Sequence, residues 1–304
     1  MANIINTYDL CKEYAHKLVV NNVNMHIPEH SIYGFVGENG SGKTTIMRLL
    51  TGLAEPTSGS FELFGIKNTD DEIYDARRNL SAIVETTSLV PSFNAMDNLK
   101  FAAMYMGLQV SEEERLELLK KVHLEDTGSK KVKNFSLGMK QRLGIALSLL
   151  NKPKLMLLDE PMNGLDPEGI AELRDLLIEL NQRDGISVLI SSHILSELEK
   201  IASHYGFISK GNLIQEISAA ELQDKCRKSL CVKVDNIANA QKVLQDLNFK
   251  DYRVSSNGEI NIFDDVKISD VVSAFASKGV AVIGINSNDE SVEDYYLNLI
   301  KGGN

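Results

Sequence analysis

The amino-acid sequence predicts an α/β protein with a mostly parallel sheet, followed by a smaller α+β domain. Two continuous apolar runs, at 154–159 and 186–191, have the pattern of strands that are buried on both faces of a parallel sheet. Between them lies Pro167–Leu180, which has helical spacing, with Asp166 as its expected N-cap. A further apolar run, Ile32–Val36, ends in a glycine-rich loop that leads into another helix. This alternation of strands and helices is typical of a sheet that is covered on both faces.

The first domain is expected to span residues 1–217. Short apolar stretches near its start, broken by polar segments, predict strands at Ile4–Ile5, Leu18–Val20 and Ser31–Val36. From about residue 86 to 150 the pattern changes to helices without strands between them. These helices are expected at Asp97–Met106, Ser111–Val122 and Leu137–Leu150. The change indicates a helical insertion within the α/β frame.

A second domain is expected over residues 218–304, where the elements are shorter and more polar. Strands are predicted at Leu230–Val234, Tyr252–Val254, Glu259–Phe263 and Val280–Ile285. The middle two form a hairpin around Asn257-Gly258, a typical turn sequence. Helices are predicted at Ala238–Leu247, Ile268–Ser277 and Val292–Ile300. The order predicts a small α+β domain, to which the sequence assigns no chemistry.

Composition and charge narrow the classes of function. The chain has 304 residues, 43% of them hydrophobic, and a formal net charge of −10 at pH 7. Proteins that bind nucleic acid through bulk charge are usually basic, so this balance argues against a nucleic-acid partner. No apolar run approaches the roughly 20 residues that span a bilayer, and the chain does not begin like a secretory signal. Cys11, Cys226 and Cys231 lack metal-site spacing, so we expect reduced thiols in a cytoplasmic protein.

The glycine-rich loop at 37–44 matches the pattern G-x-x-x-x-G-K-[ST] between a strand and a helix. Glycines let the backbone curl so that successive N–H groups point at a phosphate chain, and the helix that follows directs its N-terminus at the anion. Lys43 supplies a positive charge for the β- and γ-phosphates, and Thr44 offers a hydroxyl to Mg²⁺. The sequence therefore predicts a nucleoside triphosphate site. Its expected nucleotide contacts are Gly37, Asn39, Gly40, Ser41, Gly42, Lys43, Thr44 and Thr45.

Two carboxylates, Asp159 and Glu160, end one of the apolar runs. Open α/β sheets place their ligands at the carboxyl ends of the strands. We therefore expect Asp159 to hold Mg²⁺ and Glu160 to polarise an attacking water. His193 follows the next apolar run and is expected to reach the γ-phosphate as a hydrogen-bond donor. The predicted catalytic residues are Glu160, His193 and Lys43.

The segment Phe135–Arg142, FSLGMKQR, resembles the signature motif LSGGQ-x-QR of the ATP-binding cassette (ABC) proteins. Asn163–Pro167 is similar to the D-loop of that family, and His193 falls at the place of its switch histidine. Tyr14 falls where the family stacks an aromatic ring on adenine. The resemblance covers residue 1 to about residue 215. It implies a P-loop NTPase fold of the ABC ATPase type.

The resemblance also implies that two subunits share their sites. Ser136 and the backbone at Gly138 cap a helix N-terminus, which favours anions. In the family this helix completes the ATP site of a second subunit, so that two ATP molecules lie in a head-to-tail dimer. We therefore expect Ser136 and Gly138 to contact the ATP of a partner, in a homodimer or in a pair of different ATPase subunits.

Two departures from the family pattern point to one branch of the family. Glu85 stands where the family usually has Gln, and the resemblance implies that it binds Mg²⁺ together with Thr44 and Asp159. Leu137 and Met139 replace a Gly and a Gln of the signature. Both departures are similar to the ATPase subunits of bacitracin- and lantibiotic-resistance exporters.

The leading hypothesis is an ATP-hydrolysing subunit that uses ATP and Mg²⁺ to power a separate membrane permease. The resemblance implies export of a peptide antibiotic of the bacitracin or lantibiotic type, or of another lipophilic compound. We expect the protein to be cytoplasmic and to lie at the inner face of the cell membrane through the permease. The alternatives are a soluble ABC ATPase acting on DNA or ribosomes and a cofactor-assembly scaffold without a permease. The short segment between Lys43 and Ser136 leaves no room for a long coiled coil, and only one phosphate loop is present.

Overall fold

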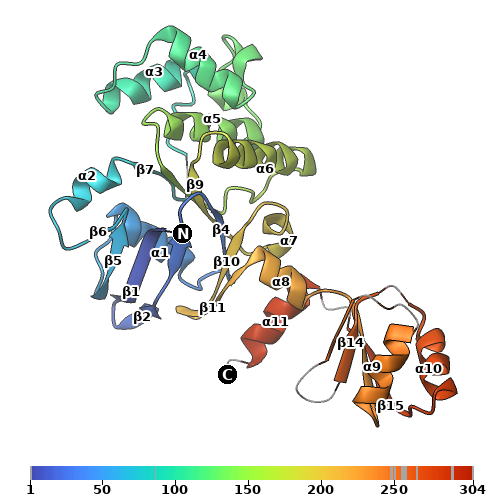
Figure 1. Cartoon of the computed structure of the whole chain (residues 1–304). Helices are drawn as coiled ribbons and strands as arrows, with labels where there is room; N and C mark the ends of the chain where they lie inside the picture. The colour runs from blue at the N-terminus through green and yellow to red at the C-terminus, as the bar shows by residue number, and fades with distance from the viewer. Residues whose placement is uncertain are drawn as a thin grey trace. The chain divides into compact units, whose positions relative to one another are not determined.

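The computed structural model describes residues 2–85, 87–246, 249, 251–254, 259–264, 266–288 and 291–302. The chain divides into two compact units, Met1–Ala219 and Ala220–Lys301. Each unit has its own cluster of buried apolar side chains, and Figure 1 shows the elements of both. Within the described ranges, no helix has both the length and the apolar character that a membrane crossing requires.

A six-stranded sheet forms the centre of the first unit. Its strands are β4 (Ile32–Val36), β7 (Leu80–Ile83), β8 (Leu155–Asp159), β9 (Ser187–Ser192), β10 (His204–Ser209) and β11 (Asn212–Ser218). They lie in the order β11-β10-β4-β9-β8-β7, and every neighbouring pair is parallel except β11 with β10. All side chains of β4 and β9 are buried, which explains why their sequences are apolar without alternation. The prediction of an α/β fold with a mostly parallel sheet is confirmed.

A second, antiparallel sheet packs against the first. It contains β1 (Asn3–Tyr14), β2 (Lys17–Val23), β3 (His26–Pro28), β5 (Ser58–Leu63) and β6 (Ile66–Lys67). The order is β2-β1-β5-β6, and β3 also pairs with β1. Ile5 and Phe61 of this sheet share one buried cluster with Phe35 and Leu157 of the parallel sheet. The two sheets therefore form a common core.

Outside the insertion, the helices of the first unit are α1 (Lys43–Thr51), α2 (Ile73–Arg77), α6 (Pro167–Gln182) and α7 (Leu195–Leu198). Two of them, α1 and α6, begin beside residues that favour helix boundaries. α1 is flanked by Gly42 and Gly52, both with left-handed backbone. Before α6, the Asp166 carboxylate accepts a hydrogen bond from the Gly169 N–H at 3.0 Å. The buried face of α6 consists of Gly169, Leu173, Leu176, Leu177 and Leu180.

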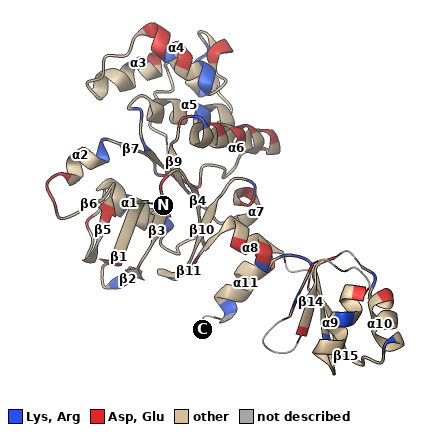
Figure 2. Cartoon of the chain, in the orientation of Figure 1, with Lys and Arg blue, Asp and Glu red and all other residues tan. Residues whose placement is uncertain are grey.

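The segment between β7 and β8 is helical. It contains α3 (Ala95–Tyr105), α4 (Glu112–Lys121) and α5 (Leu137–Leu149). Asn94 caps α3 by accepting from the Asp97 N–H at 2.7 Å, and Ser111 forms a capping box with Glu114 at the start of α4. Acidic residues lie in the first turn of α4 and basic residues in its last turn, coloured red and blue in Figure 2, an order that suits the helix dipole.

The second unit is an α+β sandwich. Its sheet contains β12 (Ser229–Val234), β13 (Tyr252–Val254), β14 (Glu259–Ile262) and β15 (Val282–Asn288), in the antiparallel order β13-β14-β12-β15. Its helices are α8 (Ala219–Lys225), α9 (Ile237–Asp246), α10 (Ile268–Ser277) and α11 (Val292–Gly302). The strand order with crossover helices α9 and α10 is the ferredoxin-like arrangement. The predicted turn at Asn257-Gly258 lies outside the described residues.

Candidate functional site

The glycine-rich loop lies between β4 and α1, and its shape depends on missing side chains. Gly40 and Gly42 have φ of 80° and 111°, where glycine is favoured. A Cβ on Gly42 would lie 2.9 Å from the carbonyl oxygen of Val19 in β2. A Cβ on Gly37 would lie 2.5 Å from the carbonyl oxygen of Ile208 in β10. Strands from both sheets therefore fix the curl of the loop.

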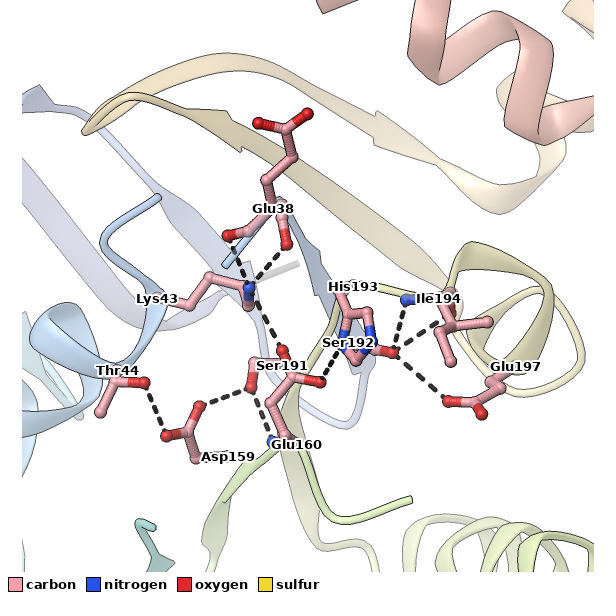
Figure 3. A network of polar contacts seen from close by, with 11 residues as sticks. Glu38, Lys43, Thr44, Asp159, Glu160, Ser191, Ser192, His193, Ile194 and Glu197 are labelled. Carbon is pink, nitrogen blue, oxygen red and sulfur yellow. Dashed lines mark hydrogen bonds and ion pairs between the residues drawn. The ribbon is translucent and has the colours of Figure 1, made fainter. Parts of the chain in front are cut away.

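Lys43 is buried at the start of α1, and its ammonium group lies inside this curl (Figure 3). Its Nζ donates hydrogen bonds to the carbonyl oxygens of Gly37 at 2.6 Å and Glu38 at 3.1 Å. The same Nζ lies 3.2 Å from Oε1 of Glu160. Three oxygen atoms from two separate segments thus surround the one positive charge of the loop.

Asp159 at the end of β8 has a separate partner for each carboxylate oxygen. Oδ2 accepts a hydrogen bond from Oγ1 of Thr44 at 2.7 Å, and Oδ1 accepts one from Oγ of Ser191 at 2.7 Å. The strand end and the first turn of α1 therefore meet at this carboxylate, as Figure 3 shows. The sequence motifs predict Thr44 and Asp159 at one metal site, but no motif marks Ser191, because its contact depends on the alignment of β9 with β8.

Glu160 follows directly and has backbone φ of 49°, an uncommon value for a residue other than glycine. Its Oε2 lies 2.8 Å from Nδ1 of His193. Its Oε1, apart from the approach of Lys43, accepts no hydrogen bond from any described residue. The structure thus brings the three predicted catalytic residues into direct contact. In this arrangement the imidazole of His193 contacts the carboxylate of Glu160.

A further carboxylate lies near this cluster and was missed by the sequence analysis. Oγ of Ser192 lies 3.4 Å from Oε2 of Glu197, which belongs to the short helix α7 (Figure 3). Burial raises the pKa of the Glu197 carboxyl above its ordinary value, and the charge of Glu160 adds to the rise. The hydrogen bond from Ser192 and the nearby His193 oppose it. No residue pattern in the sequence marks Glu197 as part of this site.

Two predicted residues have other partners. Glu85 forms an ion pair with Arg48, which lies one helical turn after Thr44 on α1. Tyr14 ends β1 and is half-exposed, and Lys12 Nζ lies 4.8 Å from the centre of its ring. Among the described residues, neither Tyr14 nor Glu85 has a hydrogen bond or ion pair with the Lys43–Asp159–Glu160 cluster.

The signature segment is packed against the loop that follows β8. Oγ of Ser136 accepts a hydrogen bond from the Met139 N–H at 3.2 Å and caps α5. Nε2 of Gln141 donates to the carbonyl oxygen of Pro161 at 2.9 Å. A Cβ on Gly138 would lie 3.7 Å from Cα of Gly169 at the start of α6. The N-terminus of α5, with Ser136 and Gly138, is therefore held by the loop that connects β8 to α6.

Comparison with known proteins gives consistent results. A family model described as ABC transporter matches residues 20–163. The bacitracin transport ATP-binding protein BcrA of Bacillus licheniformis is 40% identical over 306 residues, covering 100% of this chain and 99% of that protein. The lantibiotic transport ATP-binding protein SrtF of Streptococcus pyogenes is 48% identical over 208 residues, covering 68% of this chain and 88% of that protein.

A solved structure of an ATP-binding cassette has a similar fold. The ATP-binding cassette MJ0796, determined as a dimer in a post-hydrolysis state bound to ADP and Pi, is 28% identical. It covers 71% of this chain and 98% of its own, with a TM-score of 0.63. With the phosphate loop, the signature segment and the similarity along the whole chain, these findings show that the chain belongs to the ABC transporter family, as an ATP-binding subunit that hydrolyses ATP.

Proposed function

We propose that this subunit powers a separate permease that exports a peptide antibiotic of the bacitracin or lantibiotic type, or another lipophilic compound. Support comes from the two transport relatives, one of which matches the chain over its whole length. The substitutions at Glu85, Leu137 and Met139 resemble the same branch. The proposed place of the protein is the inner face of the cell membrane, where it is held by the permease.

For hydrolysis we assign Glu160 as the general base, and the arrangement of its two oxygens is the observation that carries this assignment. Oε2 is held by His193, while Oε1 lies near Lys43 without a hydrogen bond from any described residue. Oε1 is therefore able to accept a proton from an attacking water. Lys43 would stabilise charge on the γ-phosphate, and His193 would keep the carboxylate in place. Positioning and electrostatics of this kind provide most of the catalysis in phosphoryl transfer.

The residues around Asp159 fit a bound Mg²⁺. Oγ1 of Thr44 and Oδ2 of Asp159 lie 2.7 Å apart, and Mg²⁺ prefers oxygen ligands and needs only one or two from the protein beside phosphates. We propose Thr44 and Asp159 as its protein ligands. Glu85 would be a third ligand once its ion pair with Arg48 is broken. Held by these residues, Mg²⁺ would neutralise part of the negative charge of the nucleotide phosphates. In the loop, the buried Oγ of Ser41 has no hydrogen-bond partner among the described residues, which suits a polar ligand there.

Two partner surfaces follow from the same proposal. The N-terminus of α5, with Ser136 and Gly138, would contact the ATP of a second ATPase subunit, since helix N-termini favour anions. The permease would dock on the exposed apolar side chains at α3. These side chains are Phe101, Met104, Tyr105 and Met106.

The proposed cargo is tested by deleting the gene in its source organism and measuring the minimal inhibitory concentrations of bacitracin and of a lantibiotic. We expect sensitivity to at least one of them to rise. Wild-type protein should restore resistance, whereas the Glu160→Gln protein, produced at the same level, should not. Unchanged sensitivity to both compounds would exclude a peptide antibiotic as cargo. Restoration by Glu160→Gln would contradict the need for hydrolysis.

A further inference from the structure

Ser191 is a fully buried residue of β9 whose hydroxyl contacts both acidic residues at the end of β8. Its Oγ donates a hydrogen bond to Oδ1 of Asp159 at 2.7 Å and accepts one from the backbone N–H of Glu160 at 2.9 Å (Figure 3). The parallel register sets this contact, because Asp159 and Ser191 are neighbours across the two strands. A single hydroxyl therefore joins the proposed metal ligand to the proposed base.

Each hydrogen bond of Ser191 restrains a different group. With Oδ1 of Asp159 held, the carboxylate cannot rotate without losing a hydrogen bond to a charged oxygen. Its Oδ2 therefore stays beside Oγ1 of Thr44. The second bond holds the amide of Glu160 where the chain leaves the strand with φ of 49°. That backbone geometry directs the Glu160 side chain toward Lys43 and His193.

We propose that Ser191 is a positioning residue of the hydrolytic site, which orients Asp159 toward the Mg²⁺–nucleotide complex and Glu160 toward the attacking water. This inference rests on the proposed Mg²⁺ site at Thr44 and Asp159. Without the hydroxyl, Oδ1 of Asp159 loses its partner and the carboxylate gains rotational freedom. The affinity for the Mg²⁺ complex of a nucleotide then falls. The contacts of the glycine-rich loop with the phosphates do not depend on Ser191.

Ser187 provides a matched control on the same strand. It is also almost fully buried, and its Oγ accepts a hydrogen bond from the backbone N–H of His30 at 2.8 Å. It lies at the opposite end of β9, away from Asp159. Ser187→Ala therefore removes a buried hydroxyl and its bond to a backbone amide, as Ser191→Ala does, but leaves the carboxylates untouched.

The test is equilibrium binding of ADP to the full-length protein by titration calorimetry, once with Mg²⁺ and once with EDTA. The wild-type protein is expected to bind more tightly with Mg²⁺. Ser191→Ala should reduce that gain in affinity about tenfold, the effect of losing one hydrogen bond to a charged group. Its Kd for ADP in EDTA should change by less than about twofold. Ser187→Ala should lower Tm and keep the wild-type gain. Ser191→Cys has a thiol of similar size that forms only weak hydrogen bonds, so it should lose the Mg²⁺-dependent gain as Ser191→Ala does. If Ser191→Ala does not fold, Ser191→Cys is measured in its place.

Three results would contradict the inference in distinguishable ways. If Ser191→Ala or its Cys substitute keeps the wild-type Mg²⁺ gain, Ser191 does not position Asp159. If Ser187→Ala loses the gain to the same extent, the effect reflects general destabilisation of β9. If the wild-type protein gains nothing from Mg²⁺, the proposed metal site fails, and the inference that rests on it fails as well.

Discussion

Lys43 and Glu160 form an ion pair of low exposure, with Nζ 3.2 Å from Oε1. The other oxygen of the same carboxylate lies 2.8 Å from Nδ1 of His193. Because the two contacts involve different oxygens, they fix the plane of the carboxylate from both sides. A carboxylate that is held at both oxygens has little rotational freedom, which reduces the reorganisation that a reaction otherwise requires.

We expect Glu160→Gln to lower kcat for ATP hydrolysis by about 100-fold or more, the usual contribution of a general base. The amide keeps the size of the side chain, so ATP binding should persist and ATP should shift the protein toward a dimer. Phosphate release and size-exclusion chromatography measure the two effects. Glu179→Gln, on the outer part of α6, is the control and should behave like wild type. Undiminished hydrolysis in Glu160→Gln would show that another group acts as the base.

The role of Glu85 as a metal ligand can be separated from its ion pair with Arg48. Exposed ion pairs contribute about 0–1 kcal/mol to stability, so neither Glu85→Ala nor Arg48→Gln should change the free energy of unfolding by more than that. If Glu85 binds Mg²⁺, Glu85→Ala should raise the Mg²⁺ concentration for half-maximal hydrolysis by about tenfold. Arg48→Gln should not raise it. An equal rise in both variants would assign the effect to the ion pair.

Stability should fall at alkaline pH because of Tyr33. Burial, together with the neighbouring carboxylate of Glu216, raises the pKa of this phenol well above its ordinary value. Its hydroxyl donates to Oε1 of Glu216 at 2.7 Å. An unfolded chain loses the tyrosine proton near pH 10, whereas the folded chain retains it. The stabilising contribution is therefore complete below about pH 10 and decreases as the pH rises further.

Urea denaturation between pH 8 and pH 11 tests this expectation for Tyr33→Phe. The free energy of unfolding of this variant should decline less steeply above about pH 10 than that of the wild type. Some slope should remain, because burial also raises the pKa of Tyr205. The exposed Tyr74 provides the control, and Tyr74→Phe should keep the wild-type slope. Equal slopes in all three proteins would contradict a retained proton on Tyr33.

The second unit should unfold independently when its core is weakened. Phe275 of α10 is fully buried among Val232, Ile260 and Val271. Phe275→Ala should destabilise this unit by about 3–5 kcal/mol, which calorimetry would record as a separate transition at lower temperature. ADP binding should remain, because the nucleotide site lies in the first unit. Phe101→Ala, at a half-exposed position, is the control. Loss of ADP binding together with the low transition would show that the first unit depends on the second.

Much of the site is predictable from sequence because its residues stand at strand ends in short motifs. The glycine-rich loop with Lys43, and Asp159 with Glu160, each follow an apolar run directly. Ser191 is different, since its role depends on which strand lies beside β8 and in what register. The ion pair of Glu85 is also not predictable from local sequence, because its partner Arg48 belongs to α1, far away in the chain.

In the fold, too, elements with a clear local pattern are predictable, whereas elements that depend on distant parts of the chain are not. Continuous apolar runs reveal β4, β8 and β9, which are buried on both faces. The antiparallel strands β5 and β6 are short, Gly59 within β5 has positive φ, and so does Phe64 between the two strands, so their pattern is weak. They are strands because β5 pairs with β1 and β6 pairs with β5. Local patterns therefore predict the central layer better than the sheet that packs against it.

The two close approaches at Gly37 and Gly42 have a consequence for the thermodynamics of binding. The carbonyl groups of Ile208 and Val19 leave no space for a Cβ at these two glycines, so the loop packs closely against both strands. A nucleotide that enters a preformed loop needs little ordering of the backbone, so association carries a small penalty in conformational entropy. Under the proposed function, more of the free energy of ATP binding would then be left to drive the association of two subunits. The rigidity of one short loop would thereby link nucleotide affinity to the subunit association that the proposed transport requires.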